Sequence, residues 1–182
     1  MSPLLAEAVA VRKSADQLFS QAVVTEAIKR LAAEVSSRFG DTNPLVLMVP
    51  RGGCYVAAKL MELLDFPLEF DLLQLTRYQN QTSGGELEVR ATPATKLQGR
   101  HLIIVDDILD QGITLQALID FCALRNPASV SSLVLVDKQC QRAVDIEADL
   151  VGIRAPDRYL FGCGMDYKGY WRNLPAIYAV AE

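Results

Sequence analysis

The sequence lacks the residue patterns that mark metal centres and disulfide-stabilised folds. It contains one histidine and four cysteines, and Cys54, Cys122, Cys140 and Cys163 are scattered along the chain without forming a CxxC pair. Zinc sites need closely spaced cysteine or histidine ligands, and disulfide frameworks are typical of short, cysteine-rich secreted chains. This pattern therefore argues against both. We expect four reduced cysteines, as in a cytosolic protein, each packed in the interior.

The sequence also lacks a basic excess and any long apolar run. Its 18 lysines and arginines stand against 22 aspartates and glutamates, which gives a formal net charge of −4. Nucleic-acid binding calls for a basic face, so small partners are favoured. No window reaches the roughly 18 apolar residues of a membrane span, and residues 1–19 lack the basic start and apolar run of a secretory signal. We therefore expect a cytoplasmic protein that binds neither nucleic acid nor membrane.

Low-complexity tracts, internal repeats and long linkers are missing as well. The 182-residue chain has 51% apolar and 22% charged residues, which is an ordinary globular composition. A domain of this size buries roughly 70% of the surface that its unfolded chain exposes. We expect residues 1–182 to form a single domain.

Helical and strand patterns alternate along the chain. Apolar residues at helical spacing predict helices over 24–39, 56–64 and 115–122. Short apolar runs predict buried strands over 45–49, 70–75, 102–105, 130–136 and 150–153, with a strand arm over 87–92. This alternation is typical of an α/β fold with a doubly wound, mostly parallel sheet flanked by helices. The segment from Arg154 onward shows no clear period.

Three carboxylates follow the most apolar of these strands, in the stretch IIVDDILDQGIT. They are Asp106, Asp107 and Asp110. Carboxylates this close raise one another's pKa or require a cation between them, so a purely structural role is unusual. The sequence therefore predicts that something positively charged, or rich in hydroxyl groups, binds at the end of this strand.

The turn between Asp110 and Thr114 opens the next predicted helix. A helix N-terminus attracts phosphate through its free N–H groups and its positive dipole end. Gly112 lets a phosphate approach the backbone, and Thr114 adds a hydroxyl. A ribose phosphate fits this arrangement, because the carboxylates can accept from its hydroxyls while the turn holds its phosphate. The alternative is a solvated turn in which Asp110 caps the helix.

The stretch VDDILDQGIT resembles the phosphoribosyl pyrophosphate (PRPP) signature of the type I phosphoribosyltransferases. The segment from Pro50 to Gly53 resembles their pyrophosphate loop. Lys138 stands where the 6-oxopurine enzymes place a lysine, and residues 155–174 resemble their purine-binding segment. The matches span most of the chain, from about residue 45 onward, and together they resemble the bacterial hypoxanthine-guanine phosphoribosyltransferases.

The resemblance implies a purine-salvage activity. Such enzymes transfer the 5-phosphoribosyl group from PRPP to N9 of hypoxanthine or guanine, and they release IMP or GMP together with pyrophosphate. The resemblance also implies Mg²⁺ as cofactor, a homo-oligomer (dimer or tetramer), a mobile lid loop and a small purine-binding hood built from the C-terminal segment.

The resemblance further assigns roles to the acidic residues. Asp106 and Asp107 would hold the ribose hydroxyls of PRPP, directly or through magnesium, and Asp166 would bind magnesium on the pyrophosphate. Asp110 would exchange a proton with N7 of the purine. Because two carboxylates stand beside it in the sequence, we expect the pKa of Asp110 to be adjustable upward.

Phosphate groups are assigned to two loops. The 5′-phosphate would be held by Asp110, Gln111, Gly112, Ile113 and Thr114. The pyrophosphate would be held by Arg51, Gly52 and Arg172. Gln111 stands where the family pattern has threonine, so one hydroxyl is lost and the backbone N–H groups should carry more of the phosphate contact.

The purine would lie against Lys138, Tyr159 and the backbone of Leu160. A lysine donor at position 6 of the purine accepts a carbonyl group and opposes an amino group, so adenine should be rejected. The polar stretch over 77–85 resembles the lid. It carries Arg77 and Tyr78 where the family has a Ser-Tyr pair, which leaves the role of Arg77 open.

Three alternatives remain open at this point. Some proteins on the same fold are RNA-binding regulators, although they need a basic face. A phospho-acceptor receiver domain also ends a strand on paired aspartates, but it does not account for the Pro-Arg-Gly-Gly loop. A sister transferase could prefer xanthine, because the sequence does not rank hypoxanthine, guanine and xanthine.

Overall fold

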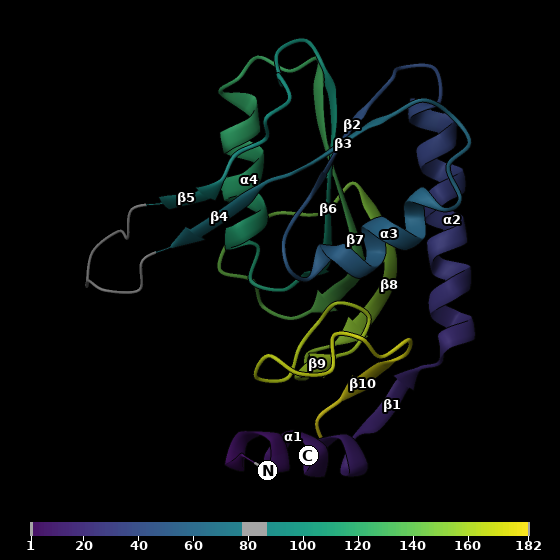
Figure 1. Ribbon diagram of the computed structural model, residues 1–182, viewed down its shortest axis with the longest axis vertical. Helices are drawn as coiled ribbons and strands as arrows, with labels where there is room; N and C mark the ends of the chain where they lie inside the picture. Colours follow the sequence, from purple (N-terminus) through teal and green to yellow (C-terminus); the bar gives the residue numbers. More distant parts are fainter. Residues whose placement is uncertain (1, 78–86, 182) are drawn as a thin grey trace.

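The computed structural model describes residues 2–77 and 87–181 (Figure 1). Its centre is a five-stranded sheet in the order β3-β2-β6-β7-β8, and every pair of neighbours is parallel. The strands are β2 (Leu45–Met48), β3 (Glu69–Leu72), β6 (His101–Leu109), β7 (Ser129–Gln139) and β8 (Leu150–Pro156). The predicted α/β fold with a parallel sheet is confirmed, and β6 is its middle strand.

Helices cover both faces of this sheet (Figure 1). The helices are α2 (Gln21–Phe39), α3 (Gly53–Met61) and α4 (Ile113–Ala123). The apolar faces of α2 and α3 pack on one side of the sheet, and that of α4 packs on the other, so two apolar cores sandwich it. The middle parts of β2, β6 and β7 are buried on both faces, which explains why they read as apolar runs, whereas the edge strand β3 is largely exposed.

A second, smaller sheet lies beyond the carboxyl ends of the central strands. It has the order β1-β10-β9 and is antiparallel, with β1 (Asp16–Phe19), β9 (Leu160–Phe161) and β10 (Ile177–Ala179). Helix α1 (Pro3–Ser14) packs beside it, which brings the two ends of the chain close together (Figure 1). The hood predicted from the C-terminal segment alone is therefore incomplete, because the N-terminal segment supplies one strand. Strands this short carry no readable periodicity.

The region after β3 differs from the single strand predicted over 70–75. Leu73 interrupts the run, is fully buried and donates its backbone N–H to Met48 O at 3.1 Å. A new strand, β4 (Gln74–Arg77), then pairs antiparallel with β5 (Leu87–Ala91), which confirms the predicted strand arm. Arg77 is the last residue of β4. The predicted lid residue Tyr78 lies outside the described residues.

Several smaller predictions are corrected. Helix α3 ends at Met61, so Leu63, predicted on its apolar face, lies beyond it and is exposed. All four cysteines are free, but only Cys122 and Cys163 are buried; Cys54 is exposed and Cys140 is partly exposed. Within residues 2–77 and 87–181, no helix is both long and apolar enough to cross a membrane.

Candidate active site

Strand β6 extends further than the predicted strand over 102–105. Its pairing with β2 ends at Val105, whereas its pairing with β7 continues to Leu109. Asp106 and Asp107 therefore lie inside the strand rather than after it. Residues 106–109 have β7 on one side and no β2 partner on the other, which leaves space beside them at the carboxyl end of the sheet, where ligands of open α/β sheets bind.

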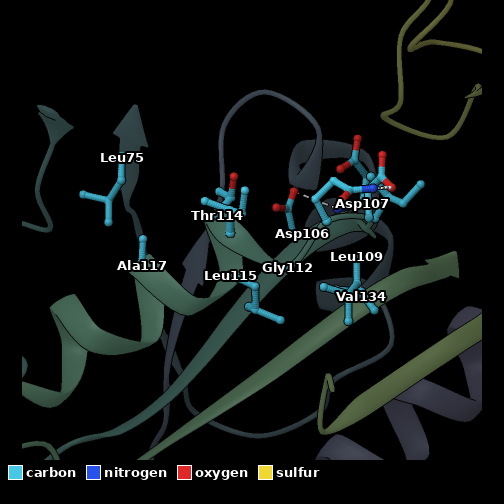
Figure 2. A pocket seen from close by; sticks show the side chains of 13 residues that line it. Leu75, Asp106, Asp107, Leu109, Gly112, Thr114, Leu115, Ala117 and Val134 are labelled. Carbon is cyan, nitrogen blue, oxygen red and sulfur yellow. Dashed lines mark hydrogen bonds between the residues drawn. The ribbon is translucent and has the colours of Figure 1, made fainter. Parts of the chain in front are cut away.

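Two adjoining cavities occupy that space. The loop cavity, of about 590 Å³, is lined by Leu75, Asp106 to Leu115, Ala117 and Val134. The cleft cavity, of about 430 Å³, is lined by Val49 to Gly52, Leu75, Asp106 to Ile108, Asp110, Thr114, Lys138, Arg158 to Leu160, Met165, Asp166 and Arg172. Figure 2 shows Asp106 and Thr114 on adjoining parts of the loop cavity, with Leu75 from β4 set opposite Val134 from β7. Every predicted site residue outside the lid lines one cavity or both.

The two acids of β6 are held close together in a desolvated position. Asp107 is only 7% exposed, and its backbone N–H donates to Asp106 Oδ1 at 2.9 Å. Burial raises the pKa of Asp106 well above its ordinary value, and the negative charge of Asp107 raises it further. Burial also raises the pKa of Asp107. The neighbouring carboxylate thus raises the pKa of Asp106, as expected from the sequence, but desolvation raises it more.

The glycines of the loop after β2 allow the backbone to pack against these acids. A Cβ added to Gly52 would overlap the Asp107 carboxylate. On the other side, Gly164 has a φ of +104°, and a Cβ there would overlap the carbonyl oxygen of Gly52. The segment from Pro50 to Gly53 is thus fitted between β6 and the C-terminal segment.

We expect Gly52→Ala to raise the KM for PRPP by roughly 10- to 100-fold, the value of one hydrogen bond to a charged group, because the new methyl group must displace the Asp107 carboxylate. Steady-state kinetics would measure this. Gly99→Ala is the matched control: φ at Gly99 is +73° but no atom lies within 4 Å of the added Cβ, so it should lower stability and leave the KM for PRPP unchanged. An unchanged KM in Gly52→Ala would show that the position of Asp107 is unimportant.

The loop after β6 leads into α4 through a glycine. Gly112 is the N-cap residue, has a φ of +80° and is capped by no side chain. The alternative in which Asp110 caps the helix is therefore wrong. Instead, Asp110 Oδ1 lies 3.0 Å from Lys138 Nζ. The charged group that contacts Asp110 is thus the lysine ammonium, whereas the sequence had suggested the carboxylates of Asp106 and Asp107.

Lys138 is held between two carboxylates. Its Nζ lies 3.0 Å from Asp110 Oδ1 and 3.0 Å from Asp157 Oδ1. Burial alone would lower the pKa of Lys138, but the hydrogen bonds to these two acids raise it above its ordinary value. Lys138 is therefore a fixed cation in the lining of the cleft cavity. Asp157 was missed from the sequence, although it lies inside the stretch that resembles a purine-binding segment.

The predicted residues of the C-terminal segment line the cleft cavity. Tyr159 is 52% exposed, and its ring meets the edge of Tyr167 with centroids 5.5 Å apart. Arg172 makes two contacts within this lining: its Nη2 lies 2.5 Å from Asp166 Oδ1, and its Nη1 donates to Gly164 O at 2.6 Å. Leu75, which lines both cavities, was predicted only as a strand residue and not as part of the site.

Comparison with known proteins agrees with this geometry. The family model for the phosphoribosyl transferase domain matches residues 14–168. The hypoxanthine-guanine phosphoribosyltransferase of Bacillus subtilis (strain 168) is 37% identical over 161 residues, which cover 88% of this chain and 89% of that protein. The hypoxanthine-guanine-xanthine phosphoribosyltransferase of Tritrichomonas foetus is 34% identical over 166 residues, or 91% of each protein.

A solved structure shows the same similarity in three dimensions. The hypoxanthine phosphoribosyltransferase of Trypanosoma cruzi, in complex with the product IMP, superposes with a TM-score of 0.84 at 28% identity, covering 92% of this chain and 95% of that one. The family match spans most of the chain, and the two relatives are 34–37% identical to it over about nine tenths of their own length. The protein therefore belongs to the phosphoribosyltransferase family.

Proposed function

We propose that this protein is a purine-salvage enzyme that transfers the 5-phosphoribosyl group of PRPP to N9 of hypoxanthine or guanine, giving IMP or GMP and pyrophosphate. The observation that carries this proposal is the convergence of a desolvated acid pair, a glycine-capped helix N-terminus and a fixed lysine on two adjoining cavities. The names of the relatives from B. subtilis and T. foetus support the same reaction.

The purine is proposed to lie in the cleft cavity. Tyr159 is exposed enough to stack its ring on the base, and Leu160 offers its backbone to the exocyclic edge. Lys138, kept as a cation by its two acidic neighbours, donates to O6 and N7. An amino group at position 6 would face this cation with a second donor, so adenine is rejected.

PRPP is proposed to extend from the cleft cavity into the loop cavity. Asp106 and Asp107 accept from the ribose hydroxyls, which replaces the water that burial has taken from them. The 5′-phosphate lies at the start of α4, where the N–H groups from Gln111 to Thr114 are available and no side chain occupies the cap.

The leaving group is proposed to lie against Arg51 and Arg172. Both line the cleft cavity, and the guanidinium group of Arg51 can bind two oxygens of a pyrophosphate at once. Arg172, which is paired with Asp166 and Gly164, adds positive charge beside the leaving group. As the bond at C1′ breaks, positive charge grows on the ribose and negative charge on the pyrophosphate. Catalysis is then chiefly a matter of positioning and electrostatic stabilisation.

The acid pair also fits a magnesium ion. Mg²⁺ prefers oxygen ligands and is usually held by one or two carboxylates together with substrate phosphates. Asp106 and Asp107 supply such oxygens, and Asp166 lines the same cleft. In the part of the chain that the structure describes, no group of three or more acidic, histidine or cysteine side chains could hold a metal unaided. Bound Mg²⁺ would neutralise charge on the pyrophosphate.

Asp110 is proposed to exchange the proton at N7 of the purine. It lines both cavities and stands beside Lys138, which contacts the same edge of the base. A carboxylate within reach of N7 can take up or return a proton as the bond at N9 forms.

We expect purine-dependent release of pyrophosphate from PRPP with hypoxanthine and guanine, and none with adenine or uracil. Xanthine belongs in the same assay, because the T. foetus relative is named for all three 6-oxopurines. Excess EDTA should abolish the activity, and added Mg²⁺ should restore it. Release that depends on adenine, or full turnover in EDTA, would contradict the proposal.

A further inference from the structure

We propose that Gln111 and Cys140 are positioning residues that hold the Asp110 carboxylate in place for its exchange with the purine. The inference rests on the proposed function and adds two residues to it. Gln111 is the position at which this chain departs from the threonine of the family pattern, and Cys140 matches none of the motifs.

The parallel pairing of β6 and β7 brings these residues together. Leu109, the last residue of β6, pairs with Asp137, two residues before the end of β7, so the residues that follow the two strands emerge near one another. Asp110 and Gln111 come after β6, and Cys140 comes directly after β7. The cluster is therefore fixed by the central sheet and does not depend on a long loop.

The contacts converge on one oxygen of Asp110. Gln111 Nε2 donates to Asp110 Oδ1 at 3.3 Å, and Cys140 Sγ lies 3.4 Å from the same atom. Lys138 Nζ is the third neighbour of Oδ1, at 3.0 Å. Cys140 Sγ is also 3.6 Å from the Asp110 carbonyl oxygen and 3.9 Å from Gln111 Nε2. Among the described residues, the hydrogen bonds and ion pairs of this side chain all use Oδ1, which leaves Oδ2 for a ligand.

The side chain of Gln111 is turned toward Asp110 and Cys140. A threonine at this position would offer a compact hydroxyl to the phosphate, whereas the longer amide reaches its own neighbour and the thiol. The phosphate loop keeps its backbone N–H groups and the Thr114 hydroxyl. The exchange of threonine for glutamine thus moves the role of this residue from phosphate contact to carboxylate positioning.

Cys140 is suited to act as a donor. Burial, together with the hydrogen bond to Asp110 and its negative charge, raises the pKa of the Cys140 thiol above its ordinary value. The thiol therefore stays protonated at neutral pH, and its S–H can donate to the carboxylate. The partial exposure of Cys140, which the sequence did not predict, follows from its place at the edge of the cavities.

The kinetic test compares Gln111→Met and Cys140→Ala with the wild type in single-turnover experiments at saturating PRPP and hypoxanthine. We expect each substitution to slow the chemical step by roughly three- to tenfold, the value of one ordinary hydrogen bond, and to leave the KM for PRPP within about twofold. Cys140→Ser keeps a donor and should restore most of the rate. Gln116→Met is the matched control, because it removes a similar bond from glutamine to Asp120 on α4, outside the site.

Three outcomes would overturn the proposal. A raised KM for PRPP with an unchanged single-turnover rate in Gln111→Met would make Gln111 a phosphate ligand. Unchanged rates in both variants, or a serine variant as slow as the alanine one, would show that neither side chain acts through Asp110.

A second measurement tests the contact without using activity. Iodoacetamide labelling of Cys140, followed by mass spectrometry, should be severalfold faster in Asp110→Asn, because the nearby negative charge is gone. Cys54 is exposed and serves as the internal control in the same sample. An unchanged ratio of Cys140 to Cys54 labelling rates would show that Cys140 does not contact the Asp110 carboxylate. If the wild type released no pyrophosphate, the proposed function would be wrong. The labelling result would still show whether Cys140 contacts Asp110.

Discussion

Replacing Asp106 and Asp107 together by asparagine is expected to raise the KM for PRPP by roughly 10²- to 10⁴-fold. Hydrogen bonds to charged groups contribute about 1.5–3 kcal/mol each, and about 1.4 kcal/mol corresponds to a factor of ten in affinity. The asparagines keep the shape of the side chains, but they lose the charge that the ribose hydroxyls or Mg²⁺ would meet.

The same double substitution is expected to leave the free protein at least as stable as the wild type at neutral pH. Burial raises the pKa of both acids, so the folded state holds their protons more tightly than the unfolded chain does. The stabilising effect of a raised carboxyl pKa is present at low pH and is lost as the pH rises from the ordinary aspartate value through the folded value. Removing both charges should therefore remove a cost that the ligand-free protein bears at neutral pH.

Thermal unfolding at several pH values and steady-state kinetics together decide this prediction. The control is Asp41→Asn combined with Asp120→Asn, which removes the same charge from two exposed positions. It should change neither measurement appreciably. A collapsed melting temperature with an unchanged KM for PRPP would assign Asp106 and Asp107 to the structure of β6 instead of to substrate binding.

Asp110→Asn is expected to lower the single-turnover rate by roughly 10²- to 10⁴-fold, the range for loss of one positioned acid-base group. PRPP binding should stay nearly intact, because the substitution leaves in place the backbone N–H groups from Gln111 to Thr114 that are proposed to hold the 5′-phosphate. Single turnover is needed, since slow product release can hide a change in the chemical step.

The stability of Asp110→Asn separates this role from a structural one. Gly112 holds the N-cap position, so the substitution removes no helix cap and should leave the melting temperature near that of the wild type. A rate within about threefold of the wild type would show that proton exchange is not the work of Asp110. Its ion pair with Lys138 would then be its main contribution.

The central sheet and the loops that carry the chemistry could be predicted from local patterns in the sequence. Residues 45–47, 102–105 and 133–136 are buried on both faces of the sheet, so each had to be a continuous apolar run. Phosphate binding at a helix start needs a glycine and a hydroxyl within a few residues of each other, so Gly112 and Thr114 form a local pattern that can be read along the chain.

The side chains that surround Asp110 and the strands that build the small sheet could be identified only in the folded chain. Cys140 meets Asp110 across 30 positions of the chain, and Tyr167 meets Glu7 of α1 across 160. Asp157 reaches Lys138 because β7 and β8 run in parallel and end together. Such contacts leave no trace in local spacing, since they depend on the strand order and register that packing selects. The desolvation of Asp106 likewise depends on packing, and it raises the pKa of Asp106 more than the neighbouring charge of Asp107 does.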